Sequence, residues 1–336
     1  MDFDIDIVIP WVNGNDLVWQ EKMKKVKRTV AADESERDLG QEGENRYRDF
    51  DTLKFLLRSI DVYTPWVRKV LLITDQQVPE WLNRNEEKVQ IVDHTDYIPS
   101  QHLPTFNSNV IELFAYKIPD LAEHFILMND DFIFAKPVKK SDFFSKYGQP
   151  VDVSAQNAFS PNNEFDYNVF KMLKQINTDF NKRDWLKEHF RKAFSFKNGL
   201  IYTPISMFLS IFPKFTGFYD PHSAAAYRKE DFEQAWEAYP TFLGNSLSAF
   251  RSRESVSHWF VRYLRLMRGD FVNQKITFNR YLPMSRLNVA DEAFYSKKYG
   301  VIILNDEDEN MAFVPLHEAV TTMLIKHFPE KSRFEK

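Results

Sequence analysis

Short apolar segments alternate with helical ones over the first 150 residues, and this order constrains the fold more than any other feature. Residues 4–10 alternate and then run apolar, as a buried strand does, and a turn-forming sequence follows at residues 13–16. Strands that alternate with helices favour a mostly parallel sheet, whose ligands bind beyond the carboxyl ends of the strands. Further strands are expected near residues 69–74, 88–92 and 124–128, and helices near 50–62 and 109–117.

Past residue 150 the strand signals fade and aromatic-rich helical patterns replace them. We therefore expect a second, mainly helical lobe. Its helices are expected near residues 165–195, 204–212, 229–239 and 253–268.

Composition and charge exclude several functions. The 44 basic and 48 acidic residues are interspersed, with a net charge of −4, so a nucleic-acid partner is not expected. The absence of cysteine excludes disulfides, thiolate metal sites and a cysteine nucleophile, and it fits a cytoplasmic setting. The acidic, strand-like start does not resemble a signal peptide, and no apolar run approaches the roughly 20 residues of a membrane span. Membrane contact would have to be peripheral.

Two acidic loops follow apolar strand-like runs. Asn129, Asp130 and Asp131 follow residues 124–128, and Asn305 and Asp306 end a similar run. Adjacent carboxylates need a cation or hydrogen-bond donors to offset their repulsion, and Mg²⁺ prefers one or two carboxylates with phosphate oxygens. The alternatives are a solvated turn at the first loop and a plain hairpin tip at the second.

The first loop combines Asn13 and Asp16 with Gly14, whose missing side chain allows the backbone to approach a ligand. The alternative is a tight turn in which Asp16 caps the helix that begins at Leu17. The two roles are compatible.

Two further segments lie next to predicted helix starts. Arg46 and Asp49 precede the helix near residues 50–62, where backbone donors favour anions, although Asp49 can equally be a simple N-cap. Asn107 belongs to a polar segment that supplies neutral donors for sugar hydroxyls. Capping of the next helix explains the neighbouring Ser108 equally well.

The second half of the chain contributes an imidazole and a guanidinium group. His222 lies in a proline-containing turn and has the side chain of a general base, although an isolated histidine is often structural. Arg251 and Arg253 precede a helix, where an arginine can neutralise phosphate in a bidentate contact. The alternative is an ion pair with Glu254 at the surface.

Taken in order, these segments resemble the four sequence blocks of the Stealth family. That family includes bacterial capsular polysaccharide phosphotransferases and the animal enzyme that places N-acetylglucosamine 1-phosphate on lysosomal glycoproteins. The first block resembles IDIVIPWVNGND, and the second runs from RYRDFDTLKFLLRSIDVYTPWVRKVLLITDQQVPEWLN through LPTFNSNVIEL to FILMNDDFIF. The third resembles FTGFYDPHSAAAYRKEDF with FRSRESVSHWF, and the fourth GVIILNDEDE. The resemblance spans residues 5 to about 308.

The resemblance implies a hexose-1-phosphotransferase of capsule or exopolysaccharide biosynthesis, in an enzyme that uses Mg²⁺ or Mn²⁺. A hexose or N-acetylhexosamine 1-phosphate would move from a nucleoside diphosphate sugar to a hydroxyl of a saccharide or lipid-linked saccharide, forming a phosphodiester and releasing nucleoside monophosphate. The chain lacks the large insertions of the animal relatives, which favours a bacterial origin. We then expect it in the cytoplasm, with peripheral contact at the inner face of the plasma membrane.

By the same resemblance, the site residues divide into three groups. The catalytic group, with His222 as general base and Arg251 (which aligns better than Arg253) on the phosphate, is Arg46, Asp49, His222 and Arg251. The donor-binding group is Asn13, Gly14, Asp16, Asn107 and Asn129. The metal-binding group is Asp130, Asp131, Asn305 and Asp306.

The implied fold is α/β, with a glycosyltransferase-A-like, mostly parallel sheet and an inserted, mainly helical lobe. Residues 1–150 and about 270–310 would form the catalytic core, about 151–269 the lobe, and 311–336 a C-terminal helix. An ordinary glycosyltransferase, which releases nucleoside diphosphate, and a non-catalytic carbohydrate-binding subunit are the alternatives. The nucleotide released distinguishes the first alternative, and the absence of turnover the second.

Overall fold

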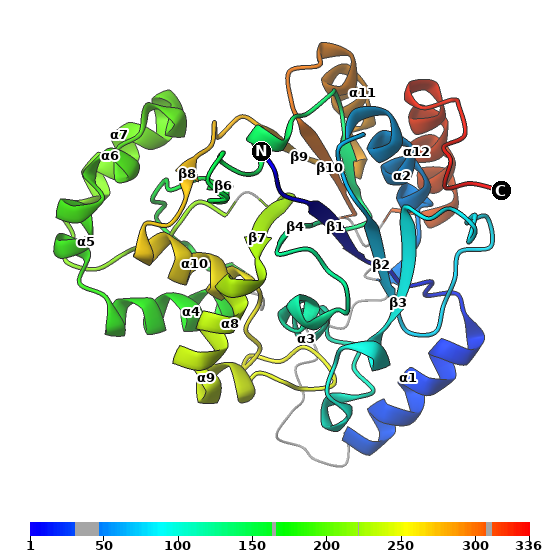
Figure 1. Ribbon diagram of the computed structural model, residues 1–336, viewed down its shortest axis with the longest axis horizontal. Helices are drawn as coiled ribbons and strands as arrows, with labels where there is room; N and C mark the ends of the chain where they lie inside the picture. The colour runs from blue at the N-terminus through cyan, green and yellow to red at the C-terminus, as the bar shows by residue number, and fades with distance from the viewer. Residues whose placement is uncertain (31–46, 163–165, 221, 307–310) are drawn as a thin grey trace.

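The computed structural model describes residues 1–30, 47–162, 166–220, 222–306 and 311–336, and it is built around a five-stranded central sheet (Figure 1). The strand order is β3-β2-β1-β4-β7, in which β7 alone runs antiparallel to its neighbour. The predicted mostly parallel sheet is therefore observed. The strands are β1 (Ile5–Pro10), β2 (Val70–Thr74), β3 (Val89–Asp93), β4 (His124–Leu127) and β7 (Ala225–Arg228).

Both faces of the central sheet are covered, which explains why its inner strands are apolar almost throughout. Along β1, Ile7 and Ile9 point into one core, and Val8 points into the other. The first core includes α2 (Thr52–Tyr63), α11 (Leu287–Ser296) and α12 (Phe313–His327). The second includes α3 (Ser108–Leu113), α4 (Asp166–Asp179), α8 (Lys229–Ala238) and α10 (Trp259–Arg268).

The strand of the fourth sequence block lies outside the central sheet. It is β10 (Val301–Asn305), which pairs with β5 (Phe132–Phe134) and β9 (Asn279–Pro283) in a second sheet. Because β5 directly follows the Asn129–Asp131 loop, this pairing brings the two predicted acidic loops together. The backbone N–H of Leu304 donates to the carbonyl oxygen of Asp131 at 3.1 Å.

The remaining elements are short or peripheral. The helices are α1 (Leu17–Val30), α5 (Lys182–Glu188), α6 (Phe190–Ala193), α7 (Gly199–Leu209) and α9 (Pro240–Gly244), and the strands are β6 (Val151–Asp152) and β8 (Val272–Asn273). Within the described part of the chain, no helix combines the length and apolar character that crossing a membrane requires.

Several predicted helices differ from the observed ones. The stretch expected to be helical at 165–195 is divided into α4, α5 and α6, and the helix expected at 204–212 runs from Gly199 to Leu209. The helix expected at 109–117 is shorter, ends at Leu113, and takes Asn107 rather than Ser108 as its N-cap. Helix α10 begins at Trp259 rather than near residue 253. Ser252 and Ser255 explain the delay, since their hydroxyl groups accept backbone hydrogen bonds that compete with a helical turn.

The proposed division into a catalytic core and a helical lobe remains a prediction. Strand β7 lies inside the segment assigned to the lobe and pairs with β4 of the central sheet over residues 225–228. That segment therefore contributes directly to the sheet that carries the site.

Candidate active site

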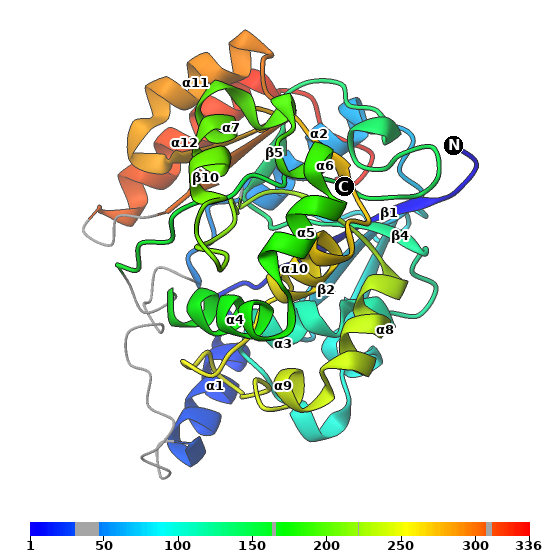
Figure 2. The ribbon, with the colours of Figure 1, turned by 90° about the vertical axis from the view of Figure 1, so that its left-hand side faces the viewer.

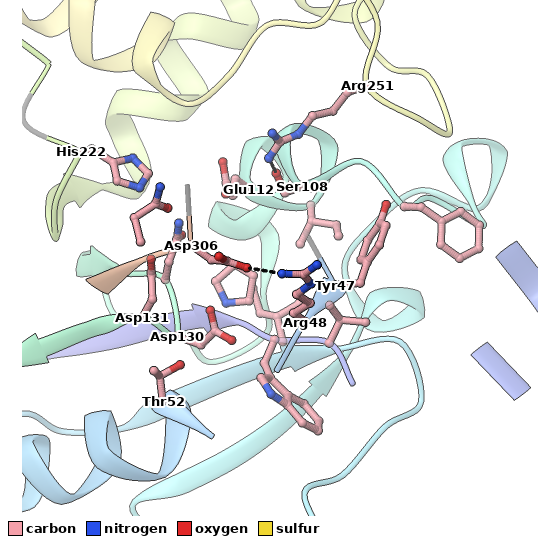
Figure 3. Close-up of a pocket in the computed structure, with 18 of the residues that line it drawn as sticks. Tyr47, Arg48, Thr52, Ser108, Glu112, Asp130, Asp131, His222, Arg251 and Asp306 are labelled. Atoms are coloured by element: carbon pink, nitrogen blue, oxygen red, sulfur yellow. Dashed lines mark hydrogen bonds and ion pairs between the residues drawn. The ribbon is translucent and has the colours of Figure 1, made fainter. Parts of the chain in front are cut away.

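A cavity of about 860 Å³ opens at the carboxyl ends of the central strands (Figure 3). Trp11 follows β1, Asp75 follows β2, His94 follows β3, and the Asn129–Asp131 loop follows β4, and all of them line it. This edge is where ligands of parallel sheets bind, because the polar loops after the strands meet there.

Predicted site residues from three separate stretches of the chain meet at this cavity. They come from the end of the second block, from the third block and from the fourth. They are Asn129, Asp130, Asp131, His222, Arg251, Asn305 and Asp306.

The negative charges of the two buried carboxyl groups after β4 are not fully balanced by nearby cations or hydrogen-bond donors among the described residues. Burial, together with the charge of Asp49, raises the pKa of Asp130 to about 7. Burial and the charge of Asp130 raise the pKa of Asp131 well above its ordinary range. One carboxylate oxygen of Asp131, Oδ1, has no hydrogen-bond partner among the described residues. Both carboxyl groups would be stabilised by a cation.

The donor set fits a divalent cation that is shared with a substrate. No cluster of three or more histidine, aspartate or glutamate side chains with metal-binding geometry occurs among the described residues. An all-protein cage is therefore not formed by that part of the chain. Mg²⁺ characteristically uses one or two carboxylates and completes its shell with water and phosphate oxygens, and the pair Asp130 and Asp131 meets that requirement.

His222 lies on the same side of the cavity as Asp131 and Asp306 (Figure 3). Its ring makes edge contacts with Phe132 and Tyr281, at centroid distances of 5.5 and 5.6 Å. Its backbone φ angle is 33°, in the left-handed region, which is unfavourable for residues other than glycine. Backbone strain of this kind gathers at functional sites and supports a functional role for the residue.

Two guanidinium groups line the cavity. Arg48 forms an ion pair of 3.5 Å with Asp306, and Arg251 donates a hydrogen bond to Oγ of Ser108 at the start of α3 (Figure 3). Arg253 points elsewhere and lies over the ring of Tyr167, 4.5 Å from its centroid. Sequence reasoning selected Arg251 but passed over Arg48 in favour of its neighbour Arg46, which lies outside the described residues.

Glu112 also lines the cavity, and sequence reasoning missed it. Burial raises the pKa of its carboxyl group to about 7, although the charge of Arg251 opposes the shift. Its Oε2 lies 3.7 Å from Nε2 of His258. The sequence feature that could have indicated this residue is its position between Ile111 and Leu113, as an acidic side chain on a short helix whose other central positions are apolar.

An aromatic wall closes the part of the cavity near α1. Trp19, Phe106 and Phe250 form a small hydrophobic cluster in which the two phenylalanine rings stack with centroids 5.3 Å apart. The pocket-lining carboxylate of Asp75 pairs with Lys22 at 2.6 Å, and burial lowers the pKa of the nearby His94 to about 4. These side chains were not predicted.

Four predicted site residues do not line the cavity but hold the segments next to it in place. Asp16 caps α1 by accepting from the N–H groups of Val18 and Trp19, at 2.8 and 3.2 Å. Asn13 accepts from Gln77 Nε2 through its backbone oxygen. A Cβ atom at Gly14 would lie 2.1 Å from the backbone oxygen of Tyr47, so the glycine permits this close approach. Asp49, whose pKa burial raises, accepts from Nε1 of Trp11 at 3.3 Å.

Asn107 is fully buried and serves the fold instead of the cavity surface. Its Oδ1 accepts the N–H of Asn109 at 3.1 Å. Its Nδ2 lies within hydrogen-bond distance of the backbone oxygens of Ser248 and Phe250, at 3.3 Å each. A sugar contact by this side chain would require breaking these bonds, so we assign it a supporting position.

Two family models match the chain. Residues 3–31 match Stealth protein CR1, conserved region 1, and residues 46–152 match Stealth protein CR2, conserved region 2. These ranges contain the first two blocks that sequence analysis identified.

Relatives with similar sequences span the whole chain. The exopolysaccharide phosphotransferase cps2G of Lactiplantibacillus plantarum is 34% identical, over 99% of this chain and 97% of its own length. The capsular polysaccharide phosphotransferase WcwK of Streptococcus pneumoniae is 34% identical, over 99% of both chains. The receptor polysaccharide phosphotransferase WefC of Streptococcus gordonii is 32% identical, over 98% of both.

Among solved structures, the galactosyltransferase LgtC in complex with donor and acceptor sugar analogues aligns with a TM-score of 0.40. The alignment covers 96% of this chain and 95% of LgtC at 9% identity.

Proposed function

The chain belongs to the Stealth family, and from this premise we propose that it transfers a hexose 1-phosphate from a nucleoside diphosphate sugar to a hydroxyl of a capsular or exopolysaccharide acceptor. It is a phosphotransferase, as its full-length relatives are. The donor, the acceptor and a cytoplasmic location are part of the proposal.

One observation carries the mechanism: the paired carboxyl groups of Asp130 and Asp131 share a cavity with His222, Arg251 and Arg48. A diphosphate is an anion that needs cations on both sides, and its acceptor hydroxyl needs a base. Acidic, cationic and imidazole groups around one space meet those needs. A site for a neutral sugar alone would not require them.

Asp130 and Asp131 are our proposed ligands for Mg²⁺ or Mn²⁺, with Asn305 and Asp306 of the adjoining loop as further oxygen donors. When bound, the ion would neutralise charge on the diphosphate oxygens. Arg48, which pairs with Asp306, is close enough to the cavity to contact a phosphate oxygen as well.

His222 is our proposed general base. The acceptor oxygen attacks the sugar-proximal phosphorus as its proton passes to the imidazole. The bond from that phosphorus to the bridging oxygen breaks, so nucleoside monophosphate leaves and the anomeric carbon keeps its oxygen. Arg251, held toward the cavity by Ser108, would stabilise the charge that develops on the transferring phosphoryl group.

The aromatic wall of Trp19, Phe106 and Phe250 is our proposed site for the nucleoside. Flat aromatic side chains provide a surface for a base, and Asp75 and His94 offer polar groups beside it. Asn13, Gly14 and Asp16 then act on the donor indirectly, because they hold α1 and Tyr47 in place. Asp49 does the same through Trp11.

Mass spectrometry of the nucleotide released tests this proposal. Purified protein, Mg²⁺ and a panel of nucleotide sugars are incubated with cell-derived acceptor, and the reaction is repeated with His222→Ala and with His102→Ala, a histidine that does not line the cavity. We expect nucleoside monophosphate from the wild type and from His102→Ala, and a loss of about 10²-fold or more with His222→Ala. Release of nucleoside diphosphate would replace the proposal with ordinary glycosyl transfer, and the absence of turnover with every donor would favour a non-catalytic binding protein.

A further inference from the structure

Helix α7 is inverted with respect to an ordinary surface helix, because its polar side chains point inward. Thr203 and Ser206 are buried. The hydroxyl of Thr203 donates to the backbone oxygen of Ser195 at 3.1 Å, and that of Ser206 accepts the N–H of Gln156 at 2.9 Å. A surface helix normally directs its apolar stripe to the core and its polar residues to water.

The outward face of α7 and its flanking turns is apolar. Leu200 is 97% exposed, Ile201 69% and Phe208 63%, and α7 contains no charged residue. Phe196, in the turn before the helix, is 91% exposed, and Ile211, in the turn after it, is 67% exposed. We call Phe196, Leu200, Ile201, Phe208 and Ile211 the α7 surface. The spacing of Leu200, Ile201 and Phe208 places these three on one helical face.

The segment that contains the α7 surface is basic, although the chain as a whole is acidic. Residues 182–214 contain seven lysine and arginine residues against two acidic ones, whereas the whole chain has a net charge of −4. Arg183, Lys187, Arg191 and Lys197 are exposed. Exposed apolar side chains beside lysine and arginine are the pattern of helices that lie in the interface of an anionic membrane.

We propose that the α7 surface docks on the anionic face of a lipid bilayer. Figure 1 shows α5, α6 and α7 together along the left-hand edge of the molecule, away from the central sheet, and in Figure 2 the same three helices lie on the side that faces the viewer. The charge of the flanking segment complements anionic lipid, and it is opposite in sign to the net charge of the chain. Apolar insertion and electrostatic attraction together provide the two signals that stable peripheral binding requires.

Helix α7 contacts the wall of the active-site cavity through a side chain outside the α7 surface. Tyr202 of α7 packs its ring against Tyr219, with centroids 4.8 Å apart, and Tyr219 lines the cavity. A bilayer at α7 would therefore hold the cavity near membrane-anchored saccharides. This use of the surface, delivery of a lipid-linked acceptor, rests on the proposed function, whereas the docking itself does not.

Co-sedimentation with vesicles tests the docking without donor or acceptor. We expect the protein to bind vesicles of phosphatidylcholine mixed with phosphatidylglycerol at least about tenfold more strongly than vesicles of phosphatidylcholine alone. The triple variant Leu200→Ser/Phe208→Ser/Ile211→Ser should bind the mixed vesicles at least about tenfold less strongly. The matched control Val62→Ser/Val314→Ser/Ile325→Ser replaces three exposed aliphatic side chains on α2 and α12 instead. It should bind as the wild type does.

A second variant separates the electrostatic contribution. Arg183→Glu/Arg191→Glu should lose the preference for anionic vesicles while retaining the weak binding to neutral ones. Turnover of a soluble saccharide acceptor should be unchanged in all of these variants, which shows that they fold and separates this test from that of the proposed function.

Three outcomes would overturn the inference. The wild type would fail to bind anionic vesicles, or the α7 triple variant would bind them as strongly as the wild type. Alternatively, light scattering would reveal a concentration-dependent dimer that the triple variant abolishes, which would make the α7 surface an interface between protein chains.

Discussion

Glu112 lies beside Arg251 and His258 at the wall of the cavity, and its pKa of about 7 makes the stability of the folded chain depend on pH. Below about pH 4.5, its carboxyl group is protonated in both the folded and the unfolded chain. Between pH 4.5 and 7 only the folded chain keeps the proton. The stability that this group contributes is therefore full at low pH and falls as the pH rises through that window.

Replacement of Glu112 by glutamine removes this penalty. We expect Glu112→Gln and the wild type to unfold with similar free energies near pH 4.5, and the variant to be more stable by up to about 3 kcal/mol at pH 8. Urea unfolding at the two pH values measures the difference, and the comparison within each pH cancels the titration of other groups. An equal difference at both pH values would contradict the assignment. Loss of turnover in the same variant would add a functional role for the carboxylate.

The two arginines of the third block provide a matched pair at the residue scale. Arg251 lines the cavity, whereas Arg253 lies over the ring of Tyr167. We expect Arg251→Gln to reduce kcat/KM by about 10²–10³-fold, because a charge that stabilises the transferring phosphoryl group is lost. Arg253→Gln should stay within about twofold of the wild type. Steady-state kinetics would reverse the assignment if Arg253→Gln had the larger effect.

At the scale of the element, the start of α3 depends on Asn107. Its side chain caps the helix and joins it to the chain ahead of α10 through the oxygens of Ser248 and Phe250. We expect Asn107→Ala to lower the free energy of unfolding by about 2–4 kcal/mol, since an N-cap and buried hydrogen bonds are lost together. The donor KM should change little in the protein that remains folded.

Asn181 offers a control for this cap, because it accepts from the N–H groups of Arg183 and Asp184 at the start of α5 while it is exposed to solvent. Asn181→Ala should cost only about 1 kcal/mol. If Asn107→Ala kept its stability and raised the donor KM instead, the donor-binding role predicted from the sequence would be supported over the structural one.

Helix α10 contains buried arginines that its sequence pattern does not predict. Arg262 and Arg265 are buried within it and pair with Asp152, at 2.8 and 2.6 Å. Arg262 also pairs with Asp220 at 2.6 Å, two residues before His222. The helix therefore anchors the turn that carries the proposed base. Its two arginines stabilise the fold from the interior, although arginine side chains on a helix usually face water.

At the scale of the whole molecule, the cavity is assembled from loops that are far apart in the chain, so its ligands should stabilise the entire fold. We expect saturating nucleotide sugar with Mg²⁺ to add about 2.7 kcal/mol at one hundred times the dissociation constant, and to raise Tm by several degrees. Differential scanning calorimetry measures the shift. Chelation of the cation should remove most of it.

The acidic pair is the expected reason for this metal dependence. Asp131→Asn should abolish the Mg²⁺-dependent part of the shift, whereas Asp184→Asn, a change at an exposed carboxylate of α5, should leave it intact. A shift of equal size without Mg²⁺ would show that the donor binds through Arg48 and Arg251 alone.

Local sequence pattern was enough to place the four parallel strands of the central sheet and β10, several helices and the polar loops after the strands, but it gave no sign of β5, β7 or β9. Hydrophobic periodicity is a local property, so β1, β2, β3 and β4 could be placed within a residue or two. The position of Asp130 and Asp131 beside the cavity could be expected from the same pattern, because a polar loop after a buried strand lies at the ligand-binding edge of a parallel sheet. Their role as metal ligands stays a prediction from the family resemblance.

Which side chains face the cavity and which support it depends on contacts made only in the folded chain. Glu112 and Arg48 line the cavity, whereas Asn107 is buried in the interior. Neither position follows from the residue type. The inverted face of α7 became visible only once burial was known. Each of these features depends on contacts between residues distant in the chain, such as the pairing of β10 with β5, and a local sequence pattern carries no record of such contacts.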